Sequence, residues 1–257
     1  MRQKRRRVGI IIKTAEELAA MREAGRIVAV TLAALREAVK PGVTTAQLDV
    51  IAEEMAHRQG AVPSFKGYRG YPASLCASLN QEVVHGIPNP RRVLHEGDII
   101  SLDYGVIYKG LQGDGAITVP VGKVSDLARR LMDVTQHALG EGIAQVRPNN
   151  RLSDIGHAIQ AYVEGEGFSV VRQYVGHGIG RSMHEEPNVP NFGVAGRGPL
   201  LKPGMVFALE PMVNVGTYET AVLEDGWTVV TEDGSLSAHF EHTVAVTADG
   251  PVVLTLP

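Results

Sequence analysis

Residues 99–114 read IISLDYGVIYKGLQGD, a run of strand-forming residues interrupted by two aspartates. The dipeptide 109–110 stands where a two-residue turn would fold this run into a β-hairpin. Such a turn pairs Asp103 with Ala116 and places Asp114 two positions along the partner strand. Because side chains alternate between the two faces of a sheet, both carboxylates are expected on the same face.

Two more acids have the same kind of setting. Glu210 follows the apolar run 206–209, and Glu241 stands between Phe240 and the run 242–246. A buried carboxylate without a partner costs several kcal/mol or more. No lysine or arginine stands in these runs to neutralise the charge. Either the acids face water or they converge on metal, and we favour the metal interpretation.

The chain also resembles itself at an offset of 107 residues. Residues 94–103 (LHEGDIISLD) match residues 201–210 (LKPGMVFALE), and both segments end in an acid. Two helix-breaking prolines keep the same offset, Pro41 and Pro148. Capping-box spacings mark the starts of two helices before the first segment, Thr14 to Glu17 and Thr44 to Gln47.

These patterns predict an α+β fold with one domain over residues 13–257, preceded by a basic tail or strand at residues 1–12. Its two pseudo-repeats span about 13–123 and 124–249, each with two helices followed by strands. Two such halves can share one central site. A chance match is the alternative, because any two α+β segments can show a glycine before an apolar run. The matched acids and prolines argue against it.

Length and composition are those of an ordinary soluble protein with a sizeable core. The chain has 257 residues and 44% apolar content, and no apolar stretch approaches the roughly 18 residues that a membrane helix needs. The apolar run 8–12 is shorter than the roughly 7–15 residues of a signal-peptide core. The single cysteine, Cys76, excludes an intramolecular disulfide and fits a reducing compartment. We expect a cytoplasmic protein that enters no membrane.

The basic start of the chain permits two interpretations. Five of the six residues 2–7 are Lys or Arg, whereas the remainder of the chain is acidic. The tail can be a solvated end. It can also be an electrostatic tether to an RNA-rich surface such as the ribosome.

Two histidines stand in segments suited to chemistry. His177 lies in the glycine-rich run 176–180, and His184 follows seven residues later. The run is not a dinucleotide fingerprint, because that pattern needs glycine where Arg181 stands. Neither His-Glu-x-x-His nor Gly-x-Ser-x-Gly occurs, which argues against the standard zinc proteases and serine hydrolases. One imidazole with four carboxylates is an oxygen-rich set that suits two divalent ions bridged by shared carboxylates.

A set of motifs resembles the methionine aminopeptidases, from about Lys13 to Thr247. The matching segments are VHGIP (84–88), Asp103, GD (113–114), GHGIG (176–180), MHEEP (183–187), LEP (209–211) and FEHT (240–243). The resemblance implies the pita-bread fold, in which two pseudo-symmetric α/β halves surround a central antiparallel sheet. It also implies the type I, bacterial form. The 31 positions between Glu210 and Glu241 leave no room for the subdomain of type II enzymes.

The resemblance further implies a role for each matched residue. One metal ion would be bound by Asp103 and the other by His177 and Glu210, with Asp114 and Glu241 bridging both. The implied reaction removes the initiator methionine from nascent proteins, as a hydroxide that bridges the ions attacks the scissile carbonyl. Glu210 is also a candidate proton shuttle.

Further residues would contact the substrate. By resemblance, His184 would stabilise the oxyanion and His85 would hydrogen-bond the peptide near the scissile nitrogen. The pocket for the methionine side chain would be formed by Tyr68, Tyr71, Cys76, Met183 and Trp227. Aromatic rings, a thiol and a thioether suit an unbranched sulfur-containing side chain.

Two rival functions remain, an Xaa-Pro peptidase of the same fold and a non-catalytic peptide-binding relative. Prolidase-like relatives usually have a large extra N-terminal domain, and a binding module would have lost ligands that this chain keeps. Manganese, iron(II), cobalt and zinc all accept carboxylate and imidazole ligands, so the metal stays open. We expect a monomer. The unmatched histidines are expected at the surface or locally satisfied: His57, His95, His137, His157 and His239.

Overall fold

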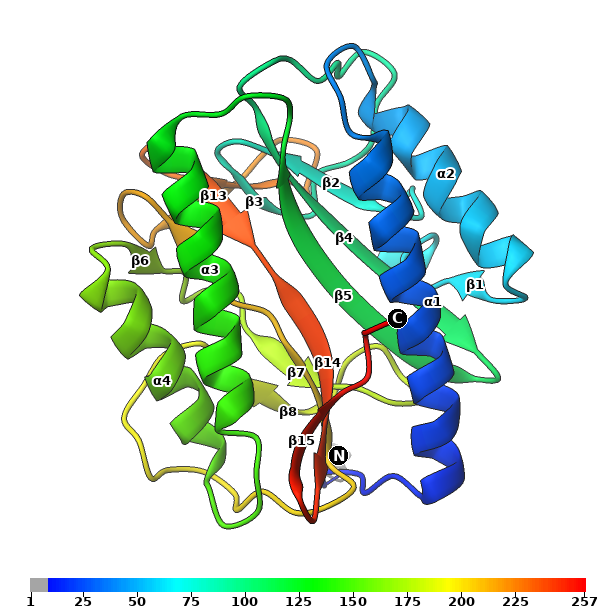
Figure 1. The fold of residues 1–257 in the computed structure, drawn as a ribbon, viewed down its shortest axis with the longest axis vertical. Coiled ribbons are helices and arrows are strands. Elements are labelled where there is room, and N and C mark those ends of the chain that lie inside the picture. Colours follow the sequence, from blue (N-terminus) through cyan, green and yellow to red (C-terminus); the bar gives the residue numbers. More distant parts are fainter. Residues whose placement is uncertain (1–8) are drawn as a thin grey trace, which may run out of the picture.

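The computed structural model describes residues 9–257, in which a twisted antiparallel sheet is covered by two helix pairs (Figure 1). The helices are α1 (Ala15–Ala38), α2 (Thr45–Arg58), α3 (Asp126–Ala144) and α4 (Leu152–Gly165). In Figure 1, α1 and α2 lie on one side of the view and α3 and α4 on the other. Residues 9–12 form neither helix nor strand. The basic residues 2–7 lie outside the described part of the chain.

Both predicted capping boxes are present. The Thr14 hydroxyl accepts a hydrogen bond from the Glu17 amide, and the Glu17 carboxylate accepts one from the Thr14 amide. Thr44 and Gln47 repeat the arrangement at the start of α2. Each box satisfies two backbone donors that a helix start leaves without partners. The boundaries of the first two helices therefore follow from local chemistry that the sequence shows.

The largest sheet contains nine strands among the described residues. Its main path runs β1-β4-β5-β14-β9-β7-β8, with β2 added on β4 and β15 on β14. The strands are β1 (Val62–Pro63), β2 (Cys76–Leu79), β4 (Ile99–Tyr108), β5 (Leu111–Pro120), β7 (Gly176–Gly178), β8 (Glu185–Val189), β9 (Val206–Leu209), β14 (Glu241–Thr247) and β15 (Gly250–Val253). All of these pairings are antiparallel.

Two three-stranded sheets flank the large one. One has the order β13-β10-β6 and the other β11-β12-β3. Their strands are β3 (Glu82–Val84), β6 (Ser169–Val170), β10 (Met212–Asn214), β11 (Thr220–Val222), β12 (Val229–Thr231) and β13 (Ser237–His239). A 3₁₀ turn, η1, spans Tyr68–Gly70. Apart from β3, the strands of the small sheets come from segments that connect the acid-bearing strands β5, β9 and β14.

The hairpin register predicted from the sequence is confirmed. Asp103 pairs with Ala116 and Gly105 with Asp114 in the β4–β5 ladder. Lys109 and the glycine after it form the two-residue loop, with φ angles of 50° and 77°. Positive φ at both loop positions matches the twist of the strands, so this turn fixes the pairing of every residue along the hairpin.

Both aspartates of the hairpin face away from the helices. A Cβ added at Gly113 would lie 2.7 Å from the backbone of Ala24 in α1, so residue 113 faces that helix. The Tyr104 hydroxyl donates to the carbonyl of Ala52 in α2 and marks the same face on β4. Asp103 and Asp114 are each one residue away from these markers and therefore point to the opposite face.

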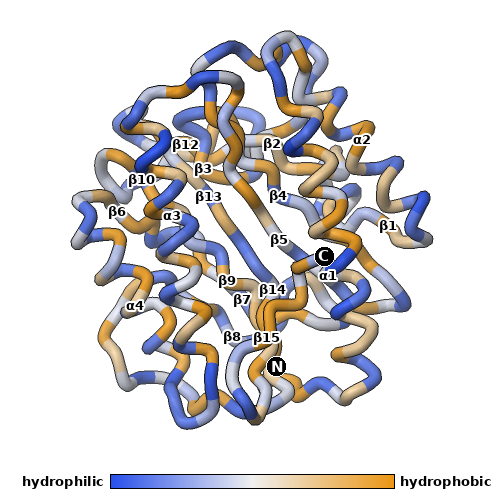
Figure 2. Tube along the Cα trace, viewed as in Figure 1, coloured by the Kyte–Doolittle hydropathy of each residue, from blue (hydrophilic) through white to orange (hydrophobic). Residues whose placement is uncertain are grey.

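The two largest apolar cores lie between the helices and the sheet. The first packs α1 and α2 against β2, β4 and β5, with Leu35, Leu48 and Leu102 fully buried. The second packs α3 and α4 against β9 and β14, with Ile155 and Phe207 fully buried. Figure 2 shows hydrophobic and hydrophilic residues alternating along the coils of α1 and α4. None of the helices in residues 9–257 has the length and apolar content that a bilayer-spanning segment requires.

The 107-residue offset reappears in the positions of the strands. β4 begins at Ile99 and β9 begins at Val206. Each follows a helix pair, and the two strands are linked through β5 and β14. The two-halved α+β arrangement is confirmed, whereas the boundaries of the pseudo-repeats stay a prediction.

Candidate metal centre and active site

The sheet register brings the acids of the two halves together. Ala116 of β5 pairs with Asp103 on one side and with Glu241 of β14 on the other. The residue after Glu241 pairs with Leu209, so Glu210 follows in the adjacent strand. Pairing across β9 then places His177 of β7 opposite Ala208. Five side chains from five strands or strand ends therefore converge on one region.

His177 is oriented as a ligand. Its Nδ1 lies 2.9 Å from the carbonyl oxygen of Gly178, which can only accept, so Nδ1 bears the proton. Nε2 is then an acceptor, 3.6 Å from Glu210 Oε1 and 3.9 Å from Asp114 Oδ2. Acceptors facing one another call for a cation between them, and a backbone carbonyl commonly fixes a metal-binding imidazole in this way. Ligand atoms of Asp114, His177 and Glu241 lie within 4.8 Å of one another.

Three carboxylate oxygens are buried without a hydrogen-bond partner, Asp103 Oδ1, Asp114 Oδ1 and Glu241 Oε1. No lysine or arginine within residues 9–257 forms an ion pair with these three acids. Buried acceptors left unpaired are expensive. Divalent cations satisfy the donor set, since the ligands are oxygen-rich with one imidazole.

The pKa values of the cluster show the same conflict. Burial raises the pKa of Asp114 to about 7. Burial also raises the pKa of Asp103, Glu210 and Glu241 well above the usual range, and the neighbouring acids add to the effect at each. The pKa of His177 is lowered to about 3, chiefly by burial. Neutral acids would relieve the repulsion in the absence of metal, whereas bound cations favour the ionised carboxylates.

These side chains form the floor of a cavity of about 150 Å³. A water molecule occupies about 30 Å³ of liquid, so the cavity has room for more than one solvent molecule or for a small side chain. The cavity is lined by every site residue predicted from the sequence: Tyr68, Tyr71, Cys76, His85, Asp103, Asp114, His177, Met183, His184, Glu210, Trp227 and Glu241.

Three lining or floor residues were missed by the sequence reasoning. Phe65 and Arg69 line the cavity, and nothing in their local sequence marks them. Gly105 stands opposite Asp114. A Cβ at position 105 would lie 3.1 Å from Asp114 Oδ1 and 3.0 Å from the Phe65 ring. Gly105 itself was a possible signal, because a glycine inside a strand often marks a place where a ligand or another part of the chain approaches the backbone closely.

Two more histidines, His85 and His184, line the same cavity as the candidate ligands. The ring centroids of His184 and His177 lie 4.2 Å apart, and His184 Nδ1 lies 2.8 Å from the Tyr68 hydroxyl. Burial, with a smaller effect from Arg69, lowers the pKa of His184. Burial lowers the pKa of His85 to about 4. Both imidazoles are therefore neutral at pH 7.

The prediction for His239 is wrong. This residue is 1% exposed, and neither of its ring nitrogens has a hydrogen-bond partner in the described structure. Its strand, β13, is buried on both faces, so alternation does not bring the side chain to solvent. The expectation holds for His57 and His95, which are exposed, and for His137 and His157, whose ring nitrogens contact backbone carbonyls.

Comparison with known proteins gives the family. Residues 19–248 match the sequence model of metallopeptidase family M24. A methionine aminopeptidase of Clostridium acetobutylicum is 56% identical over 96% of this chain and 99% of its own length. The crystal structure of a methionine aminopeptidase from Thermotoga maritima has 46% identity and a TM-score of 0.95, over 96% of this chain and 100% of that one. The chain belongs to the methionine aminopeptidase family.

The family membership confirms the resemblance read from the motifs, and with it the pita-bread fold. A more distant relative shares that fold alone. The prolidase from Pyrococcus furiosus is 20% identical, with a TM-score of 0.75 over 96% of this chain and 66% of that chain.

Removing one acid should stabilise the metal-free protein. Folding raises the pKa of Asp114 from its ordinary value to about 7. The free energy of unfolding therefore falls as the pH rises through this range, and above pH 7 the ionised Asp114 destabilises the folded chain in full. At pH 8 with chelator, Asp114→Asn should raise the melting temperature by about 2–4 °C or more, the shift that about 1 kcal/mol produces at this size.

Added Mn²⁺ should reverse the order, because it raises the melting temperature of the natural chain more than that of the variant. The exposed Asp249→Asn serves as the matched control and should change neither melting temperature. A lower melting temperature for Asp114→Asn in chelator would contradict the electrostatic account.

Proposed function

We propose that this chain removes the initiator methionine from nascent proteins, as a type I methionine aminopeptidase that depends on divalent metal ions. The main support is one observation. Five potential metal ligands converge at the floor of a cavity whose walls are aromatic and sulfur-containing. A peptide that places its first side chain against those walls has its first peptide bond beside the ligands.

The ligand roles follow the family pattern. Asp103 would hold one ion, His177 and Glu210 the other, and Asp114 and Glu241 both. Divalent ions held there would polarise the scissile carbonyl and lower the pKa of a bound water from 15.7 toward about 7. Manganese, iron(II), cobalt and zinc all fit this ligand set.

Glu210 has the environment of a proton carrier. Its side chain is 15% exposed, more than the 6% of Asp114, so one oxygen can face the cavity while the other faces His177. Burial raises the pKa of Glu210, with Asp103 and Asp114 adding to the effect. A carboxylate that reaches the reacting atoms from this position can accept a proton and return it to the departing amine.

His184 is suited to stabilise the oxyanion. Nδ1 lies 2.8 Å from the Tyr68 hydroxyl, and in the tautomer in which that hydroxyl donates to Nδ1, Nε2 bears the proton and can donate to the substrate. Because the imidazole is neutral, it donates without adding positive charge next to the ions. His85, stacked edge-on with Trp227 at 6.3 Å, would hydrogen-bond the peptide near the scissile nitrogen.

The pocket walls suit a methionine side chain. The Tyr71 hydroxyl shares its one proton between the carbonyls of Leu75 and Gly86, so the ring, not the hydroxyl, is free to contact a ligand. Trp227 packs edge-on against Tyr71 at 5.1 Å. Burying the substrate side chain would contribute about 1.5–3 kcal/mol, with a smaller sulfur–aromatic contribution.

The first test is substrate choice. The natural chain loaded with Mn²⁺ should release methionine from Met-Ala-Ser, and chelator should abolish the release. It should leave Xaa-Pro peptides uncut. Cleavage of the proline peptides alone would favour the rival Xaa-Pro peptidase, and binding of Met-Ala-Ser without release would favour the non-catalytic relative.

The second test separates the role of His184 from metal binding. His184→Ala should lower kcat by about 10²–10³-fold, the usual effect of removing one oxyanion donor, while bound metal per chain stays unchanged. Metal analysis of the purified variant provides the check. Loss of metal in His184→Ala would refute the assignment.

The basic tail lies outside the described residues, and we propose that it contacts the ribosome. The basis is its charge, since five of residues 2–7 are Lys or Arg. Co-sedimentation with ribosomes should disappear when residues 1–7 are deleted and weaken as salt rises. Equal co-sedimentation of the shortened chain would disprove the contact. We also expect the protein to be monomeric and cytoplasmic.

A further inference from the structure

His85 has a backbone conformation that needs support. Its φ angle is 61°, in the left-handed region that residues with a Cβ rarely adopt. His85 comes directly after β3. The preceding strand, β2, pairs with β4. A left-handed residue costs about 1–2 kcal/mol and persists only where surrounding contacts hold it.

Both the amide and the carbonyl of Gly86, the residue after His85, form hydrogen bonds with β2. The Gly86 amide donates to Ser78 Oγ over 3.0 Å, and its carbonyl accepts from the Ala77 amide at 2.8 Å. A Cβ at position 86 would lie 2.4 Å from the Ala77 carbonyl oxygen, so only glycine allows this approach. Because Cys76 of β2 pairs with Asp103, the support of His85 is continuous with a metal-ligand strand.

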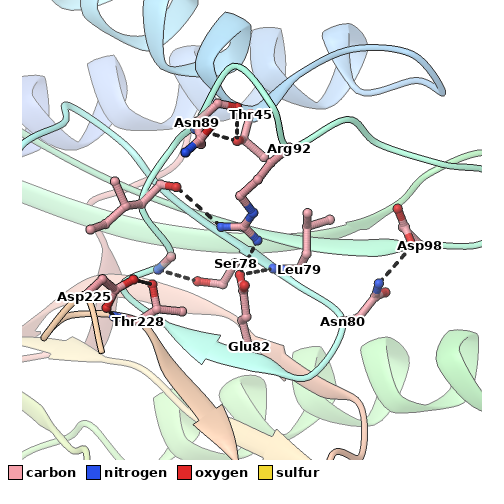
Figure 3. Close-up of polar contacts among 12 residues, drawn as sticks. Thr45, Ser78, Leu79, Asn80, Glu82, Asn89, Arg92, Asp98, Asp225 and Thr228 are labelled. Atoms are coloured by element: carbon pink, nitrogen blue, oxygen red, sulfur yellow. Dashed lines mark hydrogen bonds and ion pairs between the residues drawn. The ribbon is translucent and has the colours of Figure 1, made fainter. Parts of the chain in front are cut away.

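An ion pair then braces the segment from its far side. Arg92 donates to Glu82 Oε2 over 2.5 Å and to the carbonyl of Ile87 over 3.4 Å. The same Glu82 oxygen accepts from the Leu79 amide at 2.8 Å and so closes the turn between β2 and β3. Figure 3 shows the Arg92 side chain extending to Glu82, beside Ser78 and Leu79.

The base of Arg92 is itself fixed. Its carbonyl accepts from the Thr45 amide at 2.9 Å, at the start of α2. Thr45 Oγ1 also exchanges hydrogen bonds with the backbone of Asn89, as Figure 3 shows. Only 24% of the Arg92 side chain and 12% of the Glu82 side chain are exposed, so water screens the pair less than an ordinary surface pair.

We propose that Arg92, through Glu82 and the Ile87 carbonyl, is a positioning residue that holds His85 against the substrate. Arg92 is not among the residues that line the cavity, so it acts through His85. The planar guanidinium suits this role, because one nitrogen binds the turn before His85 and the other binds the carbonyl after it. The inference rests on the proposed function of His85.

A purely structural role for the same ion pair is the competing explanation, and a double-mutant cycle separates the two. On the Mn²⁺-loaded enzyme with Met-Ala-Ser, His85→Ala should lower kcat/KM by about 100-fold. Arg92→Gln should lower it by about tenfold, because a displaced group loses its alignment with the substrate. In the His85→Ala background, Arg92→Gln should cost less than about twofold, since its target is gone. Rates are expressed per bound metal, so that loss of folded protein does not count.

Arg91→Gln is the matched control and should leave kcat/KM unchanged, because no ion pair of the Arg91 side chain occurs in residues 9–257. Two outcomes overturn the proposal. Either Arg92→Gln has no effect in the natural background, or its tenfold loss recurs in full with His85→Ala. If His85→Ala itself keeps full activity, the proposed role of His85 fails, and if the natural chain does not cleave Met-Ala-Ser, the proposed function fails. Each failure is therefore distinguishable.

Discussion

Four acidic side chains share one cavity with no basic partner in the described structure, and the rest of the fold serves to hold them there. Asp114 and Glu241 are buried, Asp103 and Glu210 are mostly buried, and their low-dielectric surroundings raise the pKa values of all four. Left to themselves, such groups would separate into water. Two apolar cores and a continuous antiparallel ladder oppose that tendency. Packing of the helices and pairing of the strands offset the repulsion among the acids, which would otherwise destabilise the metal-free fold.

Small residues in the sheet separate the acidic side chains and let them approach one another. Ala116 lies between Asp103 and Glu241 in adjacent strands, and Gly105 lies opposite Asp114. Because neighbouring strands lie about 4.8 Å apart, side chains on one face of a pleated sheet meet across a small intervening residue. The second half of the chain supplies Glu210, Glu241 and the histidine. Neither half holds all five of the proposed ligands, which explains why one site would serve two similar halves.

Sequence reasoning succeeded where local chemistry fixes the outcome. The two-residue loop set the hairpin register, and the capping boxes set the starts of α1 and α2. It failed where long-range packing decides. Phe65 and Arg69 reach the cavity through a loop and a 3₁₀ turn, and Arg92 meets Glu82 through tertiary contacts. His239 was misjudged because a histidine outside the matched motifs was expected at the surface or locally satisfied, whereas its strand, β13, is buried along its whole length.

Anomalous diffraction from crystals grown with Mn²⁺ tests the central claim most directly. The account predicts two peaks in the cavity, each at about 2.0–2.3 Å from its carboxylate oxygens, with His177 Nε2 bound to one of them. Asp114 and Glu241 should each contact both peaks. Fully loaded crystals with no peak among these five side chains would contradict the account.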